Sequence, residues 1–396
     1  MEAIQVTLPS SKSISNRWLA LDYLSSNGIK IKNLSSADDT QLFKRLLRQM
    51  KMGRRHTFDC RDAGTAARFI TALLAFTPGT HVVTGSEYLC KRPMAPLIEA
   101  LRSIGCQIKC QVNEGFLPLQ IEGVMPTASR LKVDGSMSSQ FVSALLLAAI
   151  SLPHGLAIEL EGDVASEPYI RMKLDMMTRA GVQWALKGNP PAYHVEHNIP
   201  QCDAVVIEKD WSAASCFYGV AALRPGCRLH MSGLAHPSLQ GDCVAMEIFE
   251  RLGVVSANNG LAMEIERTGK VADTLEQDFS DTPDLVPAVA VACAGLGVEA
   301  RLSGIANLRL KESDRVASIV TELSKMGCNI EATEDVMCIH PSQLVVSQPV
   351  DTHGDHRIAM SFAMLRAIFP QLEILHPEVV SKSFPTFFEM LGRALA

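Results

Sequence analysis

An internal repeat is the feature that most restricts how this chain can fold. Each copy has a polar or small opening, an alanine-rich apolar helix, a break at glycine or proline, and a short strand-like segment. The copies begin at residues 13, 63, 137, 211, 282 and 355. Four of the five intervals measure 71 to 74 residues, and the first measures only 50. This spacing predicts six related structural modules, the first of them shortened.

The two helices of each copy differ in character. The first is apolar nearly all round, which predicts burial on every side. The second ends at a glycine before the next strand-like segment, as at Gly327, and glycine is the usual helix stop. In that copy, residues 316–326 place apolar side chains at helical spacing. The last copy is cut short by the C-terminus, and we expect residues 2–8 to supply the strand that it lacks.

Composition and charge argue against several classes of protein. The 396 residues are 47% hydrophobic and carry a formal net charge of -5, so the chain as a whole offers no basic field for nucleic acid. The apolar runs at 141–152 and 285–298 are shorter than a membrane span, and the first residues lack the pattern of a signal peptide. Eleven cysteines without a CxxC pair fit small apolar filler in a reducing compartment. We expect a cytoplasmic protein.

The openings of the repeats place cations and hydroxyls at the starts of buried helices. A helix N-terminus has unpaired N–H groups and the positive end of the dipole, which suits an anion. In the first opening Lys12 precedes Ser13 and Arg17, which share one helix face, and a single capping serine does not explain them. Residues 136–140 likewise contain more hydroxyls than one cap needs. The alternative is ordinary capping, and for the second opening a cap by Asp62 is sufficient explanation alone.

The later openings add further charged groups. Lys311 and Arg315 are four residues apart, and a like-charge pair at this spacing in a helix costs stability unless an anion lies between. The alternative is a solvated helix start capped by the serine or aspartate before Arg315. At 355–357, a histidine and an arginine at the start of a buried helix are hard to explain as packing. Asp284, among converging cations, is a candidate general base.

Taken together, these stretches resemble the 5-enolpyruvylshikimate-3-phosphate synthases, the enolpyruvyl transferases of the shikimate pathway. The motifs that occur in family order, across nearly the whole chain, are PSSKSISNR, DAGTAARF, KRP, DGSMSSQF, SEPYI, PD, NLRLKESDR, GDHRIAM and SKSFP. The resemblance implies an α/β fold of two domains, each built from three βαβαββ units, with a chain that crosses between the domains twice. Residues 1–11 plus 210–396 would form the lower domain, and residues 12–209 the upper domain with the shortened unit.

The resemblance also implies a reaction and two sets of binding residues. The family transfers the enolpyruvyl group of phosphoenolpyruvate to the 5-hydroxyl of shikimate 3-phosphate, releasing phosphate, in chorismate and aromatic amino acid biosynthesis. It needs no cofactor and no metal, and we expect a monomer whose partners are these two small molecules. The residues implied for shikimate 3-phosphate are Lys12, Ser13, Arg17, Ser138, Ser139, Gln140, Ser166, Tyr169, Asp284, Asn307 and Lys311. Those implied for phosphoenolpyruvate are Lys12, Gly64, Arg92, Gln140, Arg315, Arg357 and Lys382.

The chemistry is an addition followed by an elimination through a tetrahedral intermediate. It requires a base for the hydroxyl, a proton shuttle at C3 of the enolpyruvyl group and a donor to the departing phosphate. The resemblance implies Asp284 for the base, Glu312 for the shuttle and Lys12 for the donor, with His356 orienting Glu312. The division of labour between Asp284 and Glu312 stays open.

The chain departs from the family pattern near its first repeat. Residues 41–61 leave room for a helix and one strand, but not for the hairpin that the family usually has there. Asp62 stands where the family often has asparagine, which adds a negative charge beside the expected phosphoenolpyruvate site. Phe69 follows Arg68 where many members have proline.

Two other functions are compatible with this fold. A UDP-N-acetylglucosamine enolpyruvyl transferase usually opens with a lysine-asparagine pair, whereas Lys12 is followed by Ser13 in this chain. A non-catalytic anion-binding relative would be expected to lose Asp284, Glu312 or Lys382, and this chain keeps all three.

Overall fold

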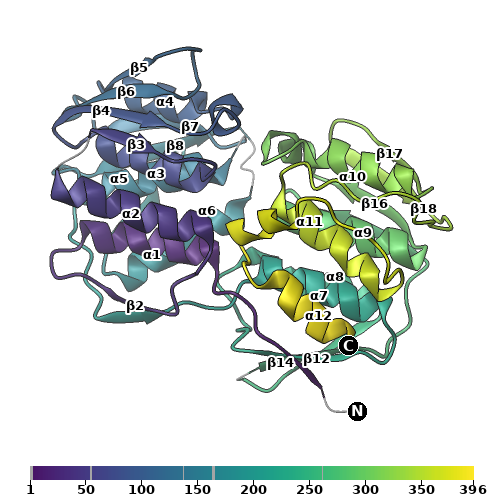
Figure 1. Cartoon of the computed structure of the whole chain (residues 1–396). Helices are drawn as coiled ribbons and strands as arrows, with labels where there is room; N and C mark the ends of the chain where they lie inside the picture. Colours follow the sequence, from purple (N-terminus) through teal and green to yellow (C-terminus); the bar gives the residue numbers. More distant parts are fainter. Residues whose placement is uncertain (1–2, 54–55, 137, 163–165, 261) are drawn as a thin grey trace. The chain divides into compact units, whose positions relative to one another are not determined.

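The chain forms two compact units. The computed structural model describes residues 3–53, 56–136, 138–162, 166–260 and 262–396. Unit 1 comprises Met1–Ser11, Ser36–Asp38 and Glu208–Ala396, and unit 2 comprises Lys12–Ser35 and Asp39–Ile207. Met137, the predicted start of the third repeat, lies outside the described residues. Each unit combines buried helices with small sheets (Figure 1).

The second and third modules of unit 2 share one topology. The second consists of β3 (Thr57–Asp59), α3 (Gly64–Leu74), β4 (Gly79–Thr84), η1 (Leu89–Lys91), α4 (Ala95–Ser103), β5 (Gln107–Cys110) and β6 (Leu119–Gly123). The third consists of β7 (Arg130–Asp134), α5 (Ser139–Ala149), β8 (Leu156–Glu161), α6 (Glu167–Arg179), β9 (Trp184–Lys187) and β10 (Ala192–Val195). The first strand of each sheet is parallel to the second, in the orders β3-β4-β6-β5 and β7-β8-β10-β9. The predicted βαβαββ unit is confirmed.

The first module of unit 2 is shortened, as the sequence predicted. It consists of α1 (Lys12–Leu24), β2 (Lys30–Lys32) and α2 (Asp38–Met52), and α2 is followed along the chain by β3. Within the described residues, β2 pairs only with β11 (Ala204–Val206), in parallel, so this sheet has two strands where its neighbours have four. Lys30 and Lys32 are exposed on this edge strand. Lysines at a free edge hinder pairing with another chain.

Unit 1 repeats the same topology twice in full. Its first module consists of β1 (Ile4–Val6), α7 (Trp211–Leu223), β12 (Arg228–Ser232), η2 (Gly241–Val244), α8 (Ala245–Arg251), β13 (Val254–Asn258) and β14 (Ala262–Arg267). Its second consists of β15 (Thr274–Asp278), η3 (Pro283–Leu285), α9 (Val286–Leu296), β16 (Glu299–Ser303), η4 (Ala306–Leu310), α10 (Arg315–Lys325), β17 (Asn329–Ala332) and β18 (Val336–His340). The last module of unit 1 contains α11 (His356–Ala363), η5 (Met364–Ala367), η6 (Pro377–Lys382) and α12 (Phe387–Leu395).

The N-terminal strand does not complete the last module, so that prediction was wrong. β1 pairs in parallel with β12 and supplies the first strand of the module that contains α7. β12 offers a full ladder for this pairing, whereas the last module has only an isolated bridge between Val350 and Ile374. Val6 and Leu8 are also buried in the same core as α7. β11 plays the matching part for α1, since it pairs with β2.

The first helix of each module is buried, as its apolar sequence predicted. Every residue of α7 is buried, and α5 and α9 are buried over most of their length. In unit 2, α3 packs against α5; in unit 1, α7, α9 and α11 pack against one another (Figure 1). No helix among the described residues combines the length and apolar character that crossing a membrane requires.

Candidate functional site

Arg17 is the centre of a cationic cluster in unit 2. Its Nη1 donates to the carbonyl oxygen of Ser13 and its Nη2 to Oγ of Ser143, both at 3.1 Å. Its guanidinium also lies 5.9 Å from the ring centroid of Phe69 and 5.7 Å from that of Tyr169. Burial lowers the pKa of Arg17 to about 10, and the charge of Tyr169 opposes this shift. A buried guanidinium held by neutral oxygens and rings is suited to an incoming anion.

Ser143 was not among the predicted residues, although the sequence contained a signal for it. It lies four residues after Ser139, so both side chains are on one face of α5. Ser138 alone caps this helix, and its Oγ accepts from the backbone N–H of Gln140 at 3.3 Å. The side-chain oxygen of Gln140 is buried without a hydrogen-bond partner among the described residues. The start of α5 therefore has more polar side chains than the helix cap requires.

Ser166 and Tyr169 lie at the start of α6, and Tyr169 contacts Arg17. Ser166 precedes the helix in the left-handed region, at φ 57°, and is buried. Tyr169 lies less than one turn later, with its ring against Arg17. The predicted residues Ser13, Arg17 and Tyr169 thus come together across α1 and α6, which pack against each other.

Two arginines meet over Gly64 at the N-terminus of α3. A Cβ atom built on Gly64 would lie 2.6 Å from Nη1 of Arg68 and 2.8 Å from Nη1 of Arg92. Arg68, which was missing from the predicted binding residues, also donates through Nη2 to the carbonyl oxygen of Pro93 at 3.0 Å. The sequence did indicate Arg68, because this residue lies one helical turn after Gly64. Two cations and a helix N-terminus favour a bound anion here.

The alternative explanation of this opening, a helix cap by Asp62, is wrong. Ala63 occupies the N-cap position of α3 and makes no side-chain cap. Asp62 instead accepts a hydrogen bond from the Ser86 hydroxyl.

Lys12, predicted to face both substrates, begins α1. Its Nζ lies 3.1 Å from Oδ2 of Asp39, and both side chains are largely buried. Asp39 therefore offsets the charge of this lysine.

Arg315 is the centre of a carboxylate cluster in unit 1. Its guanidinium donates to Asp284 and Glu312, each at 2.9 Å, and to Asp355 at 2.7 Å. The arginine side chain is 1% exposed. Burial opposes its charge, but Asp355, Glu312 and Asp284 outweigh burial and raise the pKa of Arg315 above its ordinary value. Arg315 therefore holds three carboxylates in fixed positions.

Asp284 links this cluster to Arg357. Its Oδ2 accepts from Nη2 of Arg357 at 2.6 Å, while Oδ1 accepts from Arg315. Burial alone would raise the pKa of Asp284, but the charges of Arg357, Lys311 and Arg315 outweigh burial and hold that pKa well below its ordinary value. The predicted base is thus ionised and firmly bound in this state.

Lys311 and Arg315 do not form a like-charge pair on one helix. Asp314 caps α10 by accepting from the backbone N–H of Ala317 at 2.9 Å, so the helix begins at Arg315 and Lys311 lies outside it. The aspartate cap was one of the alternatives left open by the sequence. The anionic groups around Arg315 come from the protein itself.

His356 and its neighbours begin α11. Asp355 caps this helix, accepting from the backbone N–H of Arg357 at 2.8 Å. The Nδ1 atom of His356 lies 3.6 Å from Oδ1 of Asp355, and Glu312 lies against Arg315. Orientation of Glu312 by His356 stays a prediction. Lys382 ends η6, which packs against α11.

The remaining predicted residue of unit 1 is Asn307 in η4. Its Oδ1 is buried and has no hydrogen-bond partner among the residues that the structure describes. A buried amide oxygen without a donor is rare unless a ligand or water supplies one.

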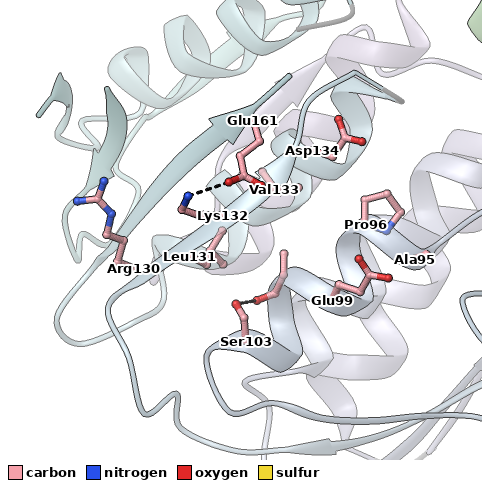
Figure 2. Close-up of a pocket in the computed structure, with 11 residues that line it drawn as sticks. Ala95, Pro96, Glu99, Ser103, Arg130, Leu131, Lys132, Val133, Asp134 and Glu161 are labelled. Atoms are coloured by element: carbon pink, nitrogen blue, oxygen red, sulfur yellow. Dashed lines mark hydrogen bonds and ion pairs between the residues drawn. The ribbon is translucent and has the colours of Figure 1, made fainter. Parts of the chain in front are cut away.

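The groove between α4 and β7 contains none of the predicted residues (Figure 2). It has a volume of about 750 Å³. Lys132 at its wall pairs with Glu161 at 2.8 Å, and Arg130 pairs with the buried Glu159 at 2.6 Å. Because its cations already have carboxylate partners, this groove is a weaker anion site than the cluster around Arg17, whose guanidinium contacts neutral oxygens and rings.

Sequence comparison relates the chain to one family over nearly its full length. Residues 3–391 match the model of the family described as EPSP synthase (3-phosphoshikimate 1-carboxyvinyltransferase). The 3-phosphoshikimate 1-carboxyvinyltransferase of Bacteroides fragilis strain YCH46 is 38% identical over 398 residues, covering 98% of this chain and 94% of the relative. The enzyme of the same name from Methanospirillum hungatei JF-1 is 34% identical, covering 97% and 94%.

Solved structures show the same fold. An EPSP synthase from Acinetobacter baumannii matches with a TM-score of 0.76 and 23% identity, over 99% of this chain and 96% of that chain. The enolpyruvyl transferase NikO from Streptomyces tendae matches with a TM-score of 0.73 and 13% identity, over 100% and 94%.

Proposed function

The chain belongs to the EPSP synthase family, and from this premise we propose that it transfers the enolpyruvyl group of phosphoenolpyruvate to the 5-hydroxyl of shikimate 3-phosphate and releases phosphate. The observation that carries the proposal is the extent of the family match. It spans residues 3–391 and so includes both charged clusters. The reaction belongs to chorismate and aromatic amino acid biosynthesis.

Both substrates are small anions, and the cluster around Arg17 supports a role in binding one of them. Shikimate 3-phosphate carries a carboxylate and a phosphate, which suit a buried guanidinium and the serines that open α5 and α6. We assign Ser13, Arg17, Ser138, Ser139, Gln140, Ser166 and Tyr169 to this substrate. Asn307 and Lys311 of unit 1 are assigned to it as well, with Asp284 at the reacting hydroxyl.

Phosphoenolpyruvate is assigned to the arginines of both units. Arg92 and Gly64 would bind it in unit 2, and the convergence of Arg68 on Gly64 adds Arg68 to the set. Arg315, Arg357 and Lys382 of unit 1 complete the assignment, together with Lys12 and Gln140. Fixed cations around anions whose charge shifts during a reaction stabilise its transition state.

The contact between Asp284 and Arg357 suggests how the base is activated. A carboxylate held by two arginines is a weak base, because its charge is already stabilised. When the carboxylate of phosphoenolpyruvate binds Arg357, it competes with Asp284 for that guanidinium. Asp284 then loses part of its stabilisation, and its pKa rises toward a value useful for taking the proton of the 5-hydroxyl.

The remaining steps follow the same assignment of protons. The hydroxyl oxygen attacks C2 of phosphoenolpyruvate while C3 gains a proton from Glu312, which enters this step as the protonated acid and leaves it as a carboxylate; this forms the tetrahedral intermediate. The intermediate then loses phosphate, to which Lys12 donates a proton, and the C3 proton returns to Glu312. Which of Asp284 and Glu312 performs each transfer remains part of the proposal.

Partners, location and domains belong to the proposal too. The net charge of -5 supports a protein that does not bind nucleic acid. We propose a cytoplasmic monomer, with residues 1–11 plus 210–396 as the lower domain and residues 12–209 as the upper domain. Neither UDP-N-acetylglucosamine transfer nor a purely binding role is favoured by a feature of the described residues.

Phosphate release tests the proposed function. The purified protein is incubated with phosphoenolpyruvate alone, with added shikimate 3-phosphate, and with added UDP-N-acetylglucosamine. We expect phosphate only in the second mixture. Phosphate release only in the third mixture would show that UDP-N-acetylglucosamine, and not shikimate 3-phosphate, is the acceptor. A folded protein that releases no phosphate in any mixture would favour the binding role.

A further inference from the structure

Lys173 is a fully buried lysine that the proposed mechanism does not use. Its side chain on α6 is 0% exposed, and its Nζ has no hydrogen-bond partner among the described residues. An ammonium group in this position costs considerable free energy, because it has lost its water and gained no acceptor. Burial, with a further contribution from the charge of Arg17, lowers the pKa of Lys173 well below its ordinary value.

The position of Lys173 on α6 places it beside the cationic cluster of unit 2. Ser166, Tyr169 and Lys173 are spaced three and four residues apart, so they lie along one side of the helix. Tyr169 on this side lies with its ring against Arg17. α6 also packs against α1, which carries Arg17, and against α5, which carries Ser143. Lys173 is therefore one turn deeper than Tyr169 on the side that meets Arg17.

Within the part of the chain that the structure describes, no carboxylate pairs with Lys173. α1 presents Arg17, whose charge repels a proton on the lysine. α5 has no titratable residue between Ser139 and Ala149. On α6 itself, Tyr169 lies one turn before Lys173, and the nearby Glu167 pairs with the exposed Arg171 at 2.7 Å. An anion that binds Arg17 would remove this repulsion.

We propose that Lys173 is a further substrate-positioning residue of unit 2, neutral when the site is empty and protonated when an anionic group of the substrate binds beside Arg17. The proton comes from solvent and converts the amine to an ammonium group as the anion arrives. The inference rests on the proposed function for the identity of that anion. Proton uptake by Lys173 and binding of the substrate anion are linked. The affinity for the anion should therefore fall as pH rises from the pKa of Lys173 in the free protein to its pKa in the complex.

Isothermal titration calorimetry of the wild-type protein tests this directly. Shikimate 3-phosphate is titrated at pH 8 in buffers that differ in ionisation enthalpy; at this pH its phosphate is already doubly ionised, with a second pKa of about 6. We expect net proton uptake on binding and weaker binding as the pH is raised further. Binding without proton uptake would overturn the role of Lys173 and leave the proposed function standing.

Two variants make the test specific to this residue. Lys173→Met should abolish the proton uptake and weaken binding about 10- to 100-fold, the loss expected for one charged hydrogen bond. Its melting temperature without ligand should stay the same or rise, because an unpartnered amine is no longer buried. Arg171→Met, on the exposed side of the same helix, should bind like the wild type. Unchanged uptake and affinity in Lys173→Met would contradict the proposal; if that variant fails to fold, the wild-type titration decides.

Two smaller anions identify the group that Lys173 meets. Uptake with shikimate assigns the lysine to the substrate carboxylate, and uptake with inorganic phosphate assigns it to the phosphate. If shikimate 3-phosphate does not bind at all, the proposed substrate is wrong. In that case the titration with inorganic phosphate tests the role of Lys173: proton uptake on binding supports it, and binding without proton uptake overturns it.

Discussion

Nη2 of Arg357 donates to Oδ2 of Asp284 at 2.6 Å. The residue proposed as base is thus held by an arginine proposed to bind phosphoenolpyruvate. Arg315 contacts the other oxygen of the same carboxylate at 2.9 Å. This arrangement keeps Asp284 ionised and weakly basic.

Replacing Asp284 should remove the base together with one carboxylate partner of Arg315 and one of Arg357. For Asp284→Asn we expect kcat to fall about 100- to 10,000-fold, the usual contribution of a positioned proton acceptor. Arg315 keeps Glu312 and Asp355 as partners, so the fold should persist. Steady-state kinetics and a thermal melt check this, with the exposed Asp273→Asn as control. A kcat within a few fold of the wild type would exclude Asp284 as the base.

Substitution of Gly64 should disturb the two arginines that meet over it. In Gly64→Ala the new Cβ would lie within 3 Å of Arg68 and Arg92, so both guanidiniums must move. We expect the KM for phosphoenolpyruvate to rise at least about tenfold, since small misplacements of binding groups are costly. Gly392→Ala on α12 is a matched control, because nothing lies within 4 Å of that position. An unchanged KM would mean that these arginines do not bind phosphoenolpyruvate.

Asp242 should make stability depend on pH. Burial, and then the charge of Asp284, raise the pKa of Asp242 from 3.8 to about 7, although the Ser212 hydroxyl opposes the shift. The folded protein therefore binds a proton that the unfolded chain has released, and stability is lost as pH rises from about 4 to about 7.

The Asp242→Asn variant isolates this contribution. It should be more stable than the wild type at pH 8, by about 1 to 4 kcal/mol, and the difference should shrink toward pH 4. Denaturant unfolding at the two pH values measures it. A difference that is the same at both pH values would show that Asp242 does not titrate in this range.

Lys382 is expected to serve substrate rather than stability. It ends η6 beside α11, the helix that carries Arg357. Lys382→Met should lower turnover or the affinity for phosphoenolpyruvate by at least about tenfold, the effect of losing one charged contact. Kinetics and a melting curve are compared. A variant that mainly loses melting temperature would contradict the assignment.

The lysines of β2 should hinder pairing of this edge strand with a second copy of the chain. Replacing Lys30 and Lys32 together by valine leaves an apolar edge strand that, within the described ranges, pairs only with β11. We expect concentration-dependent association with normal activity at high dilution, measured by light scattering. Arg301→Val, on the interior strand β16, should stay dispersed. If the double variant does not associate, the two lysines are not what prevents pairing at this edge.

The repeat and the apolar helices were readable from sequence because they follow local patterns. All-round apolar stretches predicted buried helices, and α7 is buried at every residue. The short segment at 41–61 predicted the missing hairpin. The partner of β1 was mispredicted, because pairing with β12 joins residues more than 200 positions apart and depends on which module has an open ladder.

The sequence proposed residues for the candidate site, whose roles stay a prediction, but it did not indicate the contacts between them. Spacing and family motifs pointed to Arg315 and Asp284. Their pairing depends on the approach of η3 to the start of α10, which no local pattern encodes. Arg68 and Ser143 were missed because each is ordinary in its own helix, and only the meeting with Arg92 or Arg17 gives it a role.

The most direct test of the central claim follows both products of one reaction. Phosphoenolpyruvate and shikimate 3-phosphate are mixed with the wild-type protein, and phosphorus and proton NMR spectra record inorganic phosphate and the new enolpyruvyl ether. The account predicts one phosphate released for each enolpyruvyl ether formed at the 5-hydroxyl. Phosphate without the ether, or no product from a folded protein that binds both substrates, would contradict it.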